Sequence, residues 1–183
     1  LVKSSGWFTV KLLAIEMQDP LTGKIETVSK DTVVLNSGRS GCIIDSGTTD
    51  TYIPSALRTR FSSLFSKLGG QRVASNVYSN RVFTPKSNSN LDELPLIIYT
   101  FQGPQGKPIQ IHQPTRSFTE VNPARNSLVF RLYPTEPRGT VLGANFMNNL
   151  NIAFDIDGRR IGFAPSTCHY GDVVNRAHVP DVL

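Results

Sequence analysis

Asp45 is the acidic side chain whose neighbours best suit chemistry. It follows a short apolar run, 41–44, and precedes a segment of small and hydroxylic residues, 46–49. The apolar run places the segment in a sheet, so Asp45 stands where a strand ends. Hydroxyl and amide groups of 46–49 can donate hydrogen bonds that stabilise a charged carboxyl group. Gly47 allows a close backbone approach. The pattern predicts a held, buried carboxylate.

A second element far along the chain strengthens this interpretation. An Asp before small residues is common in turns and helix caps, so Asp-Ser-Gly by itself is a weak signal. Here the segment is followed much later by Val141-Leu142-Gly143, two apolar residues and a glycine, and then by a hairpin that ends at 161–164. The combination favours a functional site over a simple turn.

The elements around Asp45 are predicted to be mainly strands. One main helix is expected at about 54–68, because Pro54 suits a first helical turn, apolar residues recur at helical spacing, and Gly69-Gly70 provides a stop. A short helix is expected at about 144–149, and Asp157-Gly158 predicts a hairpin turn. The predicted strands are 7–15, 25–28, 32–35 (forming a hairpin with 25–28), 94–101, 109–111, 128–133, 152–155 and 160–164, with 134–139 as a loop.

Composition limits the class of protein. The 183 residues suit one globular domain, and the net charge of +5 comes from scattered Lys and Arg side chains. No basic stripe alternates with aromatic residues, so a nucleic-acid partner is not expected. No apolar run approaches the roughly 20 residues that span a bilayer. The chain begins at Leu1 without a signal peptide, which predicts a piece cut from a longer precursor.

The two cysteines, Cys42 and Cys168, lack metal-ligand spacing, and the three histidines do not cluster with them. No metal or other cofactor is therefore expected. Spacing alone leaves two free thiols and one disulfide equally open.

Several motifs together resemble the C-terminal half of pepsin-family (A1) aspartic proteases. They are Asp-Ser-Gly-Thr-Thr with Tyr-Ile-Pro at 45–54, Val-Leu-Gly-Ala-Asn-Phe at 141–146, and the hairpin 151–164. The resemblance covers nearly the whole chain. It implies a mainly β fold, the C-terminal lobe of the bilobal pepsin-like acid protease fold, over 1–168. Residues 169–183 are expected to form a tail or linker.

The resemblance also implies roles for individual residues. In this family two lobes each contribute one Asp, the two carboxyl groups share a proton, and they activate a water that hydrolyses a peptide bond. Asp45 matches the second-lobe member. Ser46 matches the hydroxyl that bridges the lobes, and Thr48 matches the residue that hydrogen-bonds the catalytic carboxylate. Gly47, Thr48 and Thr49 match positions that bind the main chain of a polypeptide substrate.

Other residues are assigned packing or structural roles. The segment 141–143 is expected to pack behind the active loop. Asp155 is interpreted as a structural tie in the final hairpin and Asp157 as a turn residue. Asp50 is interpreted as a solvated loop residue, with a substrate contact as the alternative.

The run 163–169 resembles the end of the catalytic domain in membrane-anchored, memapsin-like (β-secretase-like) proteases, where a cysteine is bridged within the lobe. This implies a disulfide between Cys42 and Cys168, although the position of Cys42 departs from that pattern. A disulfide implies an oxidising compartment of the secretory pathway, hence an extracellular, endosomal, lysosomal or vacuolar location.

One part of the family pattern is missing. The chain has no second Asp-Thr-Gly or Asp-Ser-Gly and no flap tyrosine on a glycine-rich hairpin. We therefore expect half of an active site, inactive unless an N-terminal lobe joins it or the chain pairs with itself. A membrane anchor outside this chain stays open. The alternative is a non-catalytic peptide-binding or inhibitory single-lobe module, although such a module has no chemical need for the intact segment 45–49.

Overall fold

The computed structural model describes residues 6–37, 41–73, 82–83, 90–122 and 127–166. The chain divides into two compact units, Leu1–Asn148 and Asn149–Leu183, each considered by itself. The described part is mainly β with one main helix, as the sequence predicts. None of its helices has both the length and the apolar character needed to cross a membrane. The predicted tail, 169–183, lies outside the described residues.

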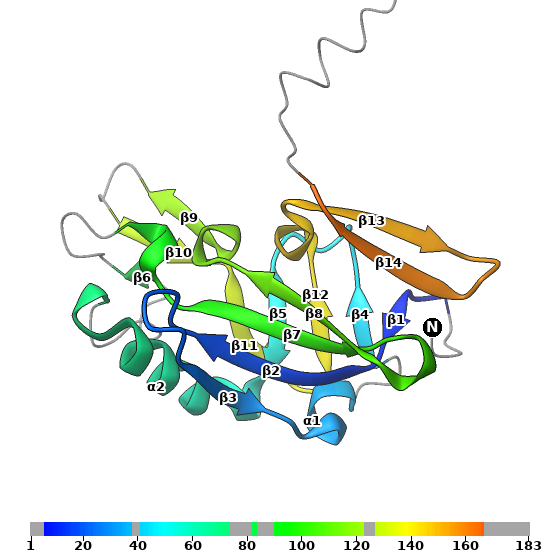
Figure 1. The fold of residues 1–183 in the computed structure, drawn as a ribbon, viewed down its shortest axis with the longest axis horizontal. Coiled ribbons are helices and arrows are strands. Elements are labelled where there is room, and N and C mark those ends of the chain that lie inside the picture. The colour runs from blue at the N-terminus through cyan, green and yellow to red at the C-terminus, as the bar shows by residue number, and fades with distance from the viewer. Residues whose placement is uncertain (1–5, 38–40, 74–81, 84–89, 123–126, 167–183) are drawn as a thin grey trace, which may run out of the picture. The chain divides into compact units, whose positions relative to one another are not determined.

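A five-stranded sheet forms one layer of the first unit (Figure 1). Its central feature is that a strand from late in the sequence, β12, lies between two strands that follow each other in sequence, β4 and β5. The β12 strand runs parallel to β4 and antiparallel to β5. The loop that joins β4 to β5 therefore has to pass over the end of β12. The strands in order are β1 (Thr9–Val10), β4 (Cys42–Ile44), β12 (Thr140–Leu142), β5 (Thr51–Pro54) and β11 (Leu132–Glu136).

A four-stranded antiparallel sheet supplies much of the hydrophobic core. Its strands in order are β3 (Ile25–Ser29), β2 (Leu12–Gln18), β7 (Leu96–Gln102) and β8 (Pro108–Gln113). The run 97–101 of β7 is buried on both faces of the sheet. The predicted strands at 94–101 and 109–111 are confirmed.

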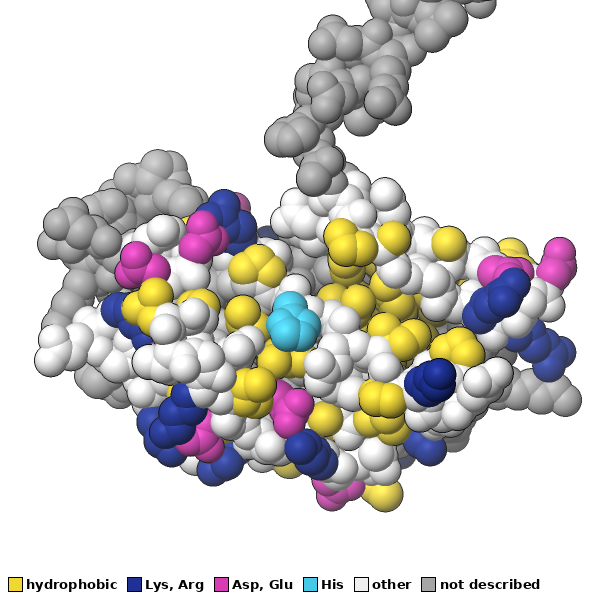
Figure 2. Space-filling model, in the orientation of Figure 1, with side chains coloured by type: hydrophobic (Ala, Val, Ile, Leu, Met, Phe, Trp, Pro, Cys, Tyr) yellow, Lys and Arg dark blue, Asp and Glu magenta, His cyan; other side chains and the backbone are white. Residues whose placement is uncertain are grey.

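Charged side chains on this sheet and the adjoining helix pair with one another. Glu16 forms a salt bridge with Lys30, with Nζ and Oε1 2.9 Å apart. Glu26 forms salt bridges with Lys24 at 3.6 Å and with Lys67 at 2.7 Å. Figure 2 shows basic and acidic side chains next to each other over β2 and β3. The positive charges of this region are therefore partly neutralised locally.

The main helix, α2 (Arg58–Gly69), buries an apolar face against the core. Its Phe65 ring meets the Phe130 ring edge to face, with centroids 5.0 Å apart. The predicted C-terminal stop is confirmed, since Gly70 ends the helix with φ at 52°. The predicted start is wrong. Pro54 has extended backbone at the end of β5, and a 3-10 turn, Ser55–Leu57, precedes the helix.

The predicted strand at 32–35 is wrong, because this segment is the helix α1 (Thr32–Asn36). The Asp31 carboxylate caps it by accepting the amides of Val33 at 2.9 Å and Val34 at 3.1 Å. The Asn36 side chain ties the other end to the backbone of Leu12 on β2. The cap and this tertiary contact outweigh the β preference of the branched side chains. The β3 strand pairs with β2 instead.

The predicted strand at 128–133 is two strands that belong to different sheets. The first, β10 (Ser127–Phe130), pairs with β9 (Thr119–Asn122) and β6 (Val82–Phe83), and the second is β11. Arg131 lies between β10 and β11. Its amide donates to the carbonyl oxygen of Phe118, and its carbonyl oxygen accepts the amide of Thr51. The predicted loop at 134–139 is wrong in its first half, since β11 continues to Glu136.

The short 3-10 helices complete the first unit. The predicted helix at about 144–149 is the 3-10 helix η7 (Ala144–Met147). Besides the turn Ser55–Leu57 (η1), the described residues also form η2 (Gly70–Arg72), η3 (Leu91–Glu93), η4 (Pro104–Gly106) and η5 (Thr115–Phe118).

The described part of the second unit, 149–166, contains an antiparallel hairpin of β13 (Leu150–Asp155) and β14 (Arg160–Pro165). This confirms the hairpin predicted around Asp157-Gly158. Asp155 accepts the amide of Gly158 at 2.7 Å and Nε of Arg160 at 2.6 Å. The hydrogen bond from Arg160 is the largest cause that lowers the pKa of Asp155. Asp155 therefore ties the turn, which is the structural role the sequence predicts.

Candidate active site

Asp45 stands directly after the last residue of β4, at the start of the loop to β5. Its amide donates to the carbonyl oxygen of Leu142 on β12 at 3.0 Å, which continues the pairing of β4 with β12 by one residue. The backbone of Asp45 is therefore held by the strand inserted between β4 and β5. This explains in physical terms why an apolar run precedes the acid.

Two donors from its own loop hold the Asp45 carboxylate. Oδ1 accepts the amide of Gly47 at 2.9 Å, and Oδ2 accepts the hydroxyl of Thr48 at 2.6 Å. Two such hydrogen bonds fix the orientation of the carboxylate. The Asp45 side chain is half-buried, while Ser46 and Thr49 beside it are exposed. Gly47 and Thr48 thus hold the Asp45 carboxylate as the sequence predicts, although the residue is half-buried and not buried as expected.

The segment after β12 packs against the back of this loop. The amide of Ala144 donates to the carbonyl oxygen of Thr48 at 2.7 Å, and the amide of Asn145 donates to that of Thr49 at 3.1 Å. Gly143 is buried so tightly that a Cβ there would lie 2.5 Å from the Thr48 oxygen and nearer still to the Asp50 oxygen. This is the packing role that the sequence predicts for 141–143.

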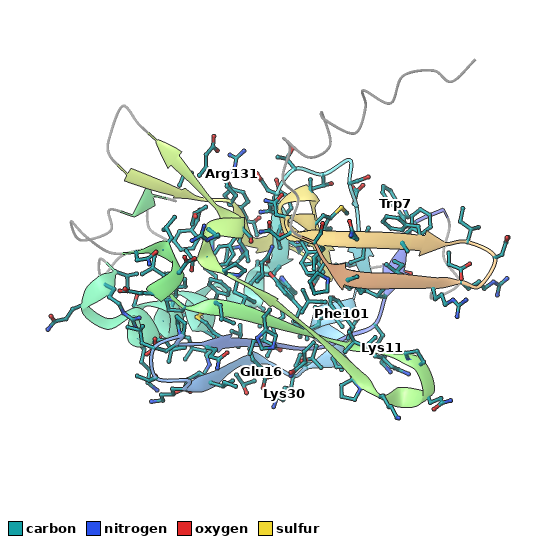
Figure 3. The ribbon with its side chains drawn as sticks, turned by 45° about the horizontal axis from the view of Figure 1, so that its top comes forward. Trp7, Lys11, Glu16, Lys30, Phe101 and Arg131 are labelled. Carbon is teal, nitrogen blue, oxygen red and sulfur yellow. The ribbon has the colours of Figure 1, made fainter. Side chains whose placement is uncertain are left out.

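Asp50 forms an ion pair within the chain. Its Oδ1 lies 3.1 Å from Nε of Arg131, and its side chain is only 12% exposed. Arg131 also lies 3.3 Å from Glu120. Figure 3 shows Arg131 at the edge of the sheet from which the β4–β5 loop emerges. The interpretation of Asp50 as a solvated loop residue is wrong, because its side chain is largely buried and pairs with the half-exposed Arg131. The substrate contact stays untested.

Burial of the Arg131 guanidinium lowers its pKa, but the charges of Asp50, Tyr133 and Glu120 outweigh this effect, so the pKa of Arg131 is raised. Arg131 thus carries a positive charge beside the side chains of Asp50 and Glu120.

Asn145 is a residue near the site that the sequence analysis missed. Its side chain bonds Thr51 and the carbonyl oxygen of Arg131, both at 2.7 Å. The available signal was a polar residue inside the otherwise apolar run 141–147. Sequence alone does not show which partners such a residue meets.

Cys42 lies three residues before Asp45 and is fully buried, which strongly raises the pKa of its thiol. Within the described residues it forms no disulfide. Its predicted partner, Cys168, lies outside the described residues, so the disulfide stays a prediction.

In the part of the chain that the structure describes, no three His, Cys, Asp or Glu side chains gather closely enough to hold a metal ion. The chemistry that the described site supports is that of an oriented carboxylate. Such a group can take a proton from a bound water. Sharing a proton requires a second carboxyl group within hydrogen-bonding distance.

Comparison with known proteins bears on this site. The family described as eukaryotic aspartyl protease matches residues 3–166. The chain is also similar to Aspartic proteinase 3 of Saccharomyces cerevisiae, with 28% identity over 131 residues. The matched region covers 71% of this chain but 20% of that protein, so the chain spans about a fifth of its relative's length.

Proposed function

The chain belongs to the eukaryotic aspartyl protease family, and we propose that it supplies the C-terminal half of an aspartic endopeptidase active site, with Asp45 as one of two catalytic carboxylates. The observation that carries the proposal is the geometry of this carboxylate. It lies at an accessible strand end, and each of its oxygens is bound by a donor of its own loop, Gly47 or Thr48.

The mechanism follows from placing a second carboxyl group beside the first. Two carboxyl groups about 3 Å apart cannot both ionise cheaply, so they hold one proton between them. The ionised member takes a proton from a bound water, and the protonated member polarises the carbonyl of the scissile peptide bond. The donors on Asp45 hold its carboxylate in one orientation, in which it can meet the second carboxyl group.

The residues around Asp45 are assigned supporting roles. Ser46 and Thr49 are exposed beside the carboxylate. In the proposal the Ser46 hydroxyl meets the other lobe beneath the pair. Gly47, Thr48 and Thr49 bind the main chain of a polypeptide substrate. The exposure of Ser46, Gly47 and Thr49 supports both roles, because an exposed residue can meet another lobe or a substrate.

The missing half is proposed to be an N-terminal lobe, present in a longer form of the same protein or as a separate chain. The short span of this chain relative to Aspartic proteinase 3 supports this. Pairing of two copies is the alternative arrangement that also yields two carboxylates. In either case the isolated lobe is expected to be inactive.

The test is cleavage of unfolded polypeptides at acidic pH by the longer protein and by the 183-residue chain. We expect pepstatin-sensitive cleavage by the longer protein alone. Asp45→Asn preserves the shape of the side chain and removes the base, so the rate is expected to fall by about 100- to 10,000-fold. Asp157→Asn, in the exposed turn of the hairpin, is the matched control and should leave the rate unchanged.

Full activity of Asp45→Asn would overturn the proposal. It would favour the second candidate, a non-catalytic module that binds peptides or another protease. Such a module would bind a peptide equally well with either residue at position 45. The donors that hold Asp45 favour the catalytic candidate, because a binding surface needs no oriented carboxylate.

We also propose that the protein enters the secretory pathway, with an extracellular, endosomal, lysosomal or vacuolar location. The predicted disulfide between Cys42 and Cys168 supports this, since disulfides persist in oxidising compartments. The likeness to memapsin-like proteases and an anchor outside this chain belong to the same proposal.

A further inference from the structure

Asn145 bonds three stretches of the chain that are distant from one another in sequence, at 49–51, 113 and 131. Its amide donates to the carbonyl oxygen of Thr49 at 3.1 Å. Its side-chain Oδ1 accepts the hydroxyl of Thr51 at 2.7 Å, and its Nδ2 donates to the carbonyl oxygen of Arg131 at 2.7 Å. Its own carbonyl oxygen accepts Nε2 of Gln113 at 3.0 Å. Asn145 therefore forms hydrogen bonds with the β4–β5 loop, with the first residue of β5, with the residue before β11 and with the last residue of β8.

These bonds are partly buried, since Asn145 and Arg131 are half-buried and their partners Thr51 and Gln113 are buried. Thr51 is fully buried and Gln113 is 2% exposed. The amide of Thr51 also donates to the Arg131 oxygen, at 3.2 Å, so that oxygen receives Asn145 and Thr51 together. Water cannot easily replace Asn145 at the buried side chains of Thr51 and Gln113, so a polar group left there without a partner is costly. The C-terminal end of the loop is thus anchored through Asn145.

A chain of hydrogen bonds connects the C-terminal end of the β4–β5 loop to the Asp45 carboxylate. Thr49 is held by Asn145, and Thr48 before it is held by the amide of Ala144 in the same 3-10 helix. The Thr48 hydroxyl in turn donates to Oδ2 of Asp45. We propose that Asn145 is a positioning residue for the catalytic loop, holding 48–51 so that the Thr48 hydroxyl meets Asp45. The inference rests on the proposed function only in calling the loop catalytic.

A purely structural role is the competing explanation, in which Asn145 stabilises the whole unit equally. The two roles differ in which amides would exchange faster after Asn145 is replaced. Gly47 is exposed, and its amide is bonded to Oδ1 of Asp45. Hydrogen exchange of this amide therefore reports the local geometry of the loop, whereas the amides of β7 report global unfolding.

The experiment is amide hydrogen exchange on the 183-residue chain, compared with Asn145→Leu and with Asn148→Ala as the matched control. Asn148 is an exposed asparagine directly after the same 3-10 helix. In Asn145→Leu we expect exchange at Gly47 and Ala144 to be about tenfold faster, which corresponds to the net loss of one or two hydrogen bonds. Exchange in β7 and in Asn148→Ala should match the unmodified chain.

The variant Asn145→Asp provides a rescue, which for a positioning role should appear at Gly47 and not in β7. Its carboxyl group keeps an acceptor for Thr51, and when protonated it regains a donor for the Arg131 oxygen. Relative to the unmodified chain at the same pH, fast exchange at Gly47 should therefore diminish as the pH falls from about 7 to about 4. If Asn145→Leu does not fold, exchange at Gly47 is measured in Thr51→Val, which removes only the hydroxyl donor.

Equal acceleration at Gly47 and in β7, or no acceleration at Gly47, would overturn the positioning role. Neither result depends on cleavage. If Asp45→Asn leaves proteolysis intact while exchange at Gly47 responds as expected, the proposed function fails and the role of Asn145 in holding the loop stands.

Discussion

Replacing Gly143 with alanine is expected to displace the candidate catalytic loop. A Cβ at this position would lie 2.5 Å from the carbonyl oxygen of Thr48 and nearer to that of Asp50. Because nonbonded heavy atoms rest at about 3.5 Å, the loop must retreat by roughly 1 Å. Overpacking of this kind costs about 1–3 kcal/mol of unfolding free energy. A misplacement of about 1 Å at a reacting group lowers the rate by about 100-fold.

Two measurements check this expectation. Urea unfolding of Gly143→Ala gives the loss of stability, and cleavage by the longer protein gives the loss of rate. The matched control is Gly162→Ala in β14, where a Cβ would lie 3.6 Å from that of Ala153, an ordinary contact. That variant should unfold like the unmodified chain. If Gly143→Ala also unfolds within about 0.5 kcal/mol of it, the tight packing behind the loop is refuted.

Two further predictions concern stability. Burial of Asp19 raises its pKa, but hydrogen bonds from Arg72, Thr22 and a backbone amide outweigh this effect, so the pKa is lowered. The ion pair of Asp19 with Arg72 therefore stabilises the fold fully above about pH 4. This stabilisation is lost as the pH falls through the pKa that Asp19 has in the folded state. Asp19→Asn should thus lose about 2–3 kcal/mol in urea unfolding at neutral pH, and the same deficit in strong acid would contradict this. Thiol titration of the unfolded, unreduced chain should find Cys42 and Cys168 blocked, with reduction costing roughly 4–5 kcal/mol, and two free thiols would end the disulfide proposal.

Local patterns predicted some elements well and others poorly. The hairpin around Asp157-Gly158 and the body of α2 were predictable because a turn dipeptide and an apolar face are local signals. The segment 32–36 was not, because its three β-branched residues favour a strand while Asp31 and a contact with β2 impose a helix. Propensity is a weak constraint where a cap and a tertiary contact act together.

The candidate site shows the same division. Asp45 and its donors Gly47 and Thr48 lie within four residues of chain, so the sequence by itself determined the held carboxylate and the resemblance to the family. The inserted strand β12 brings Gly143 and Asn145 behind the loop. Only the tertiary structure decided those partners, together with the ion pair of Asp50 and Arg131. A hydrogen bond between residues nearly a hundred positions apart depends on sheet order, and no local preference of the chain encodes that order.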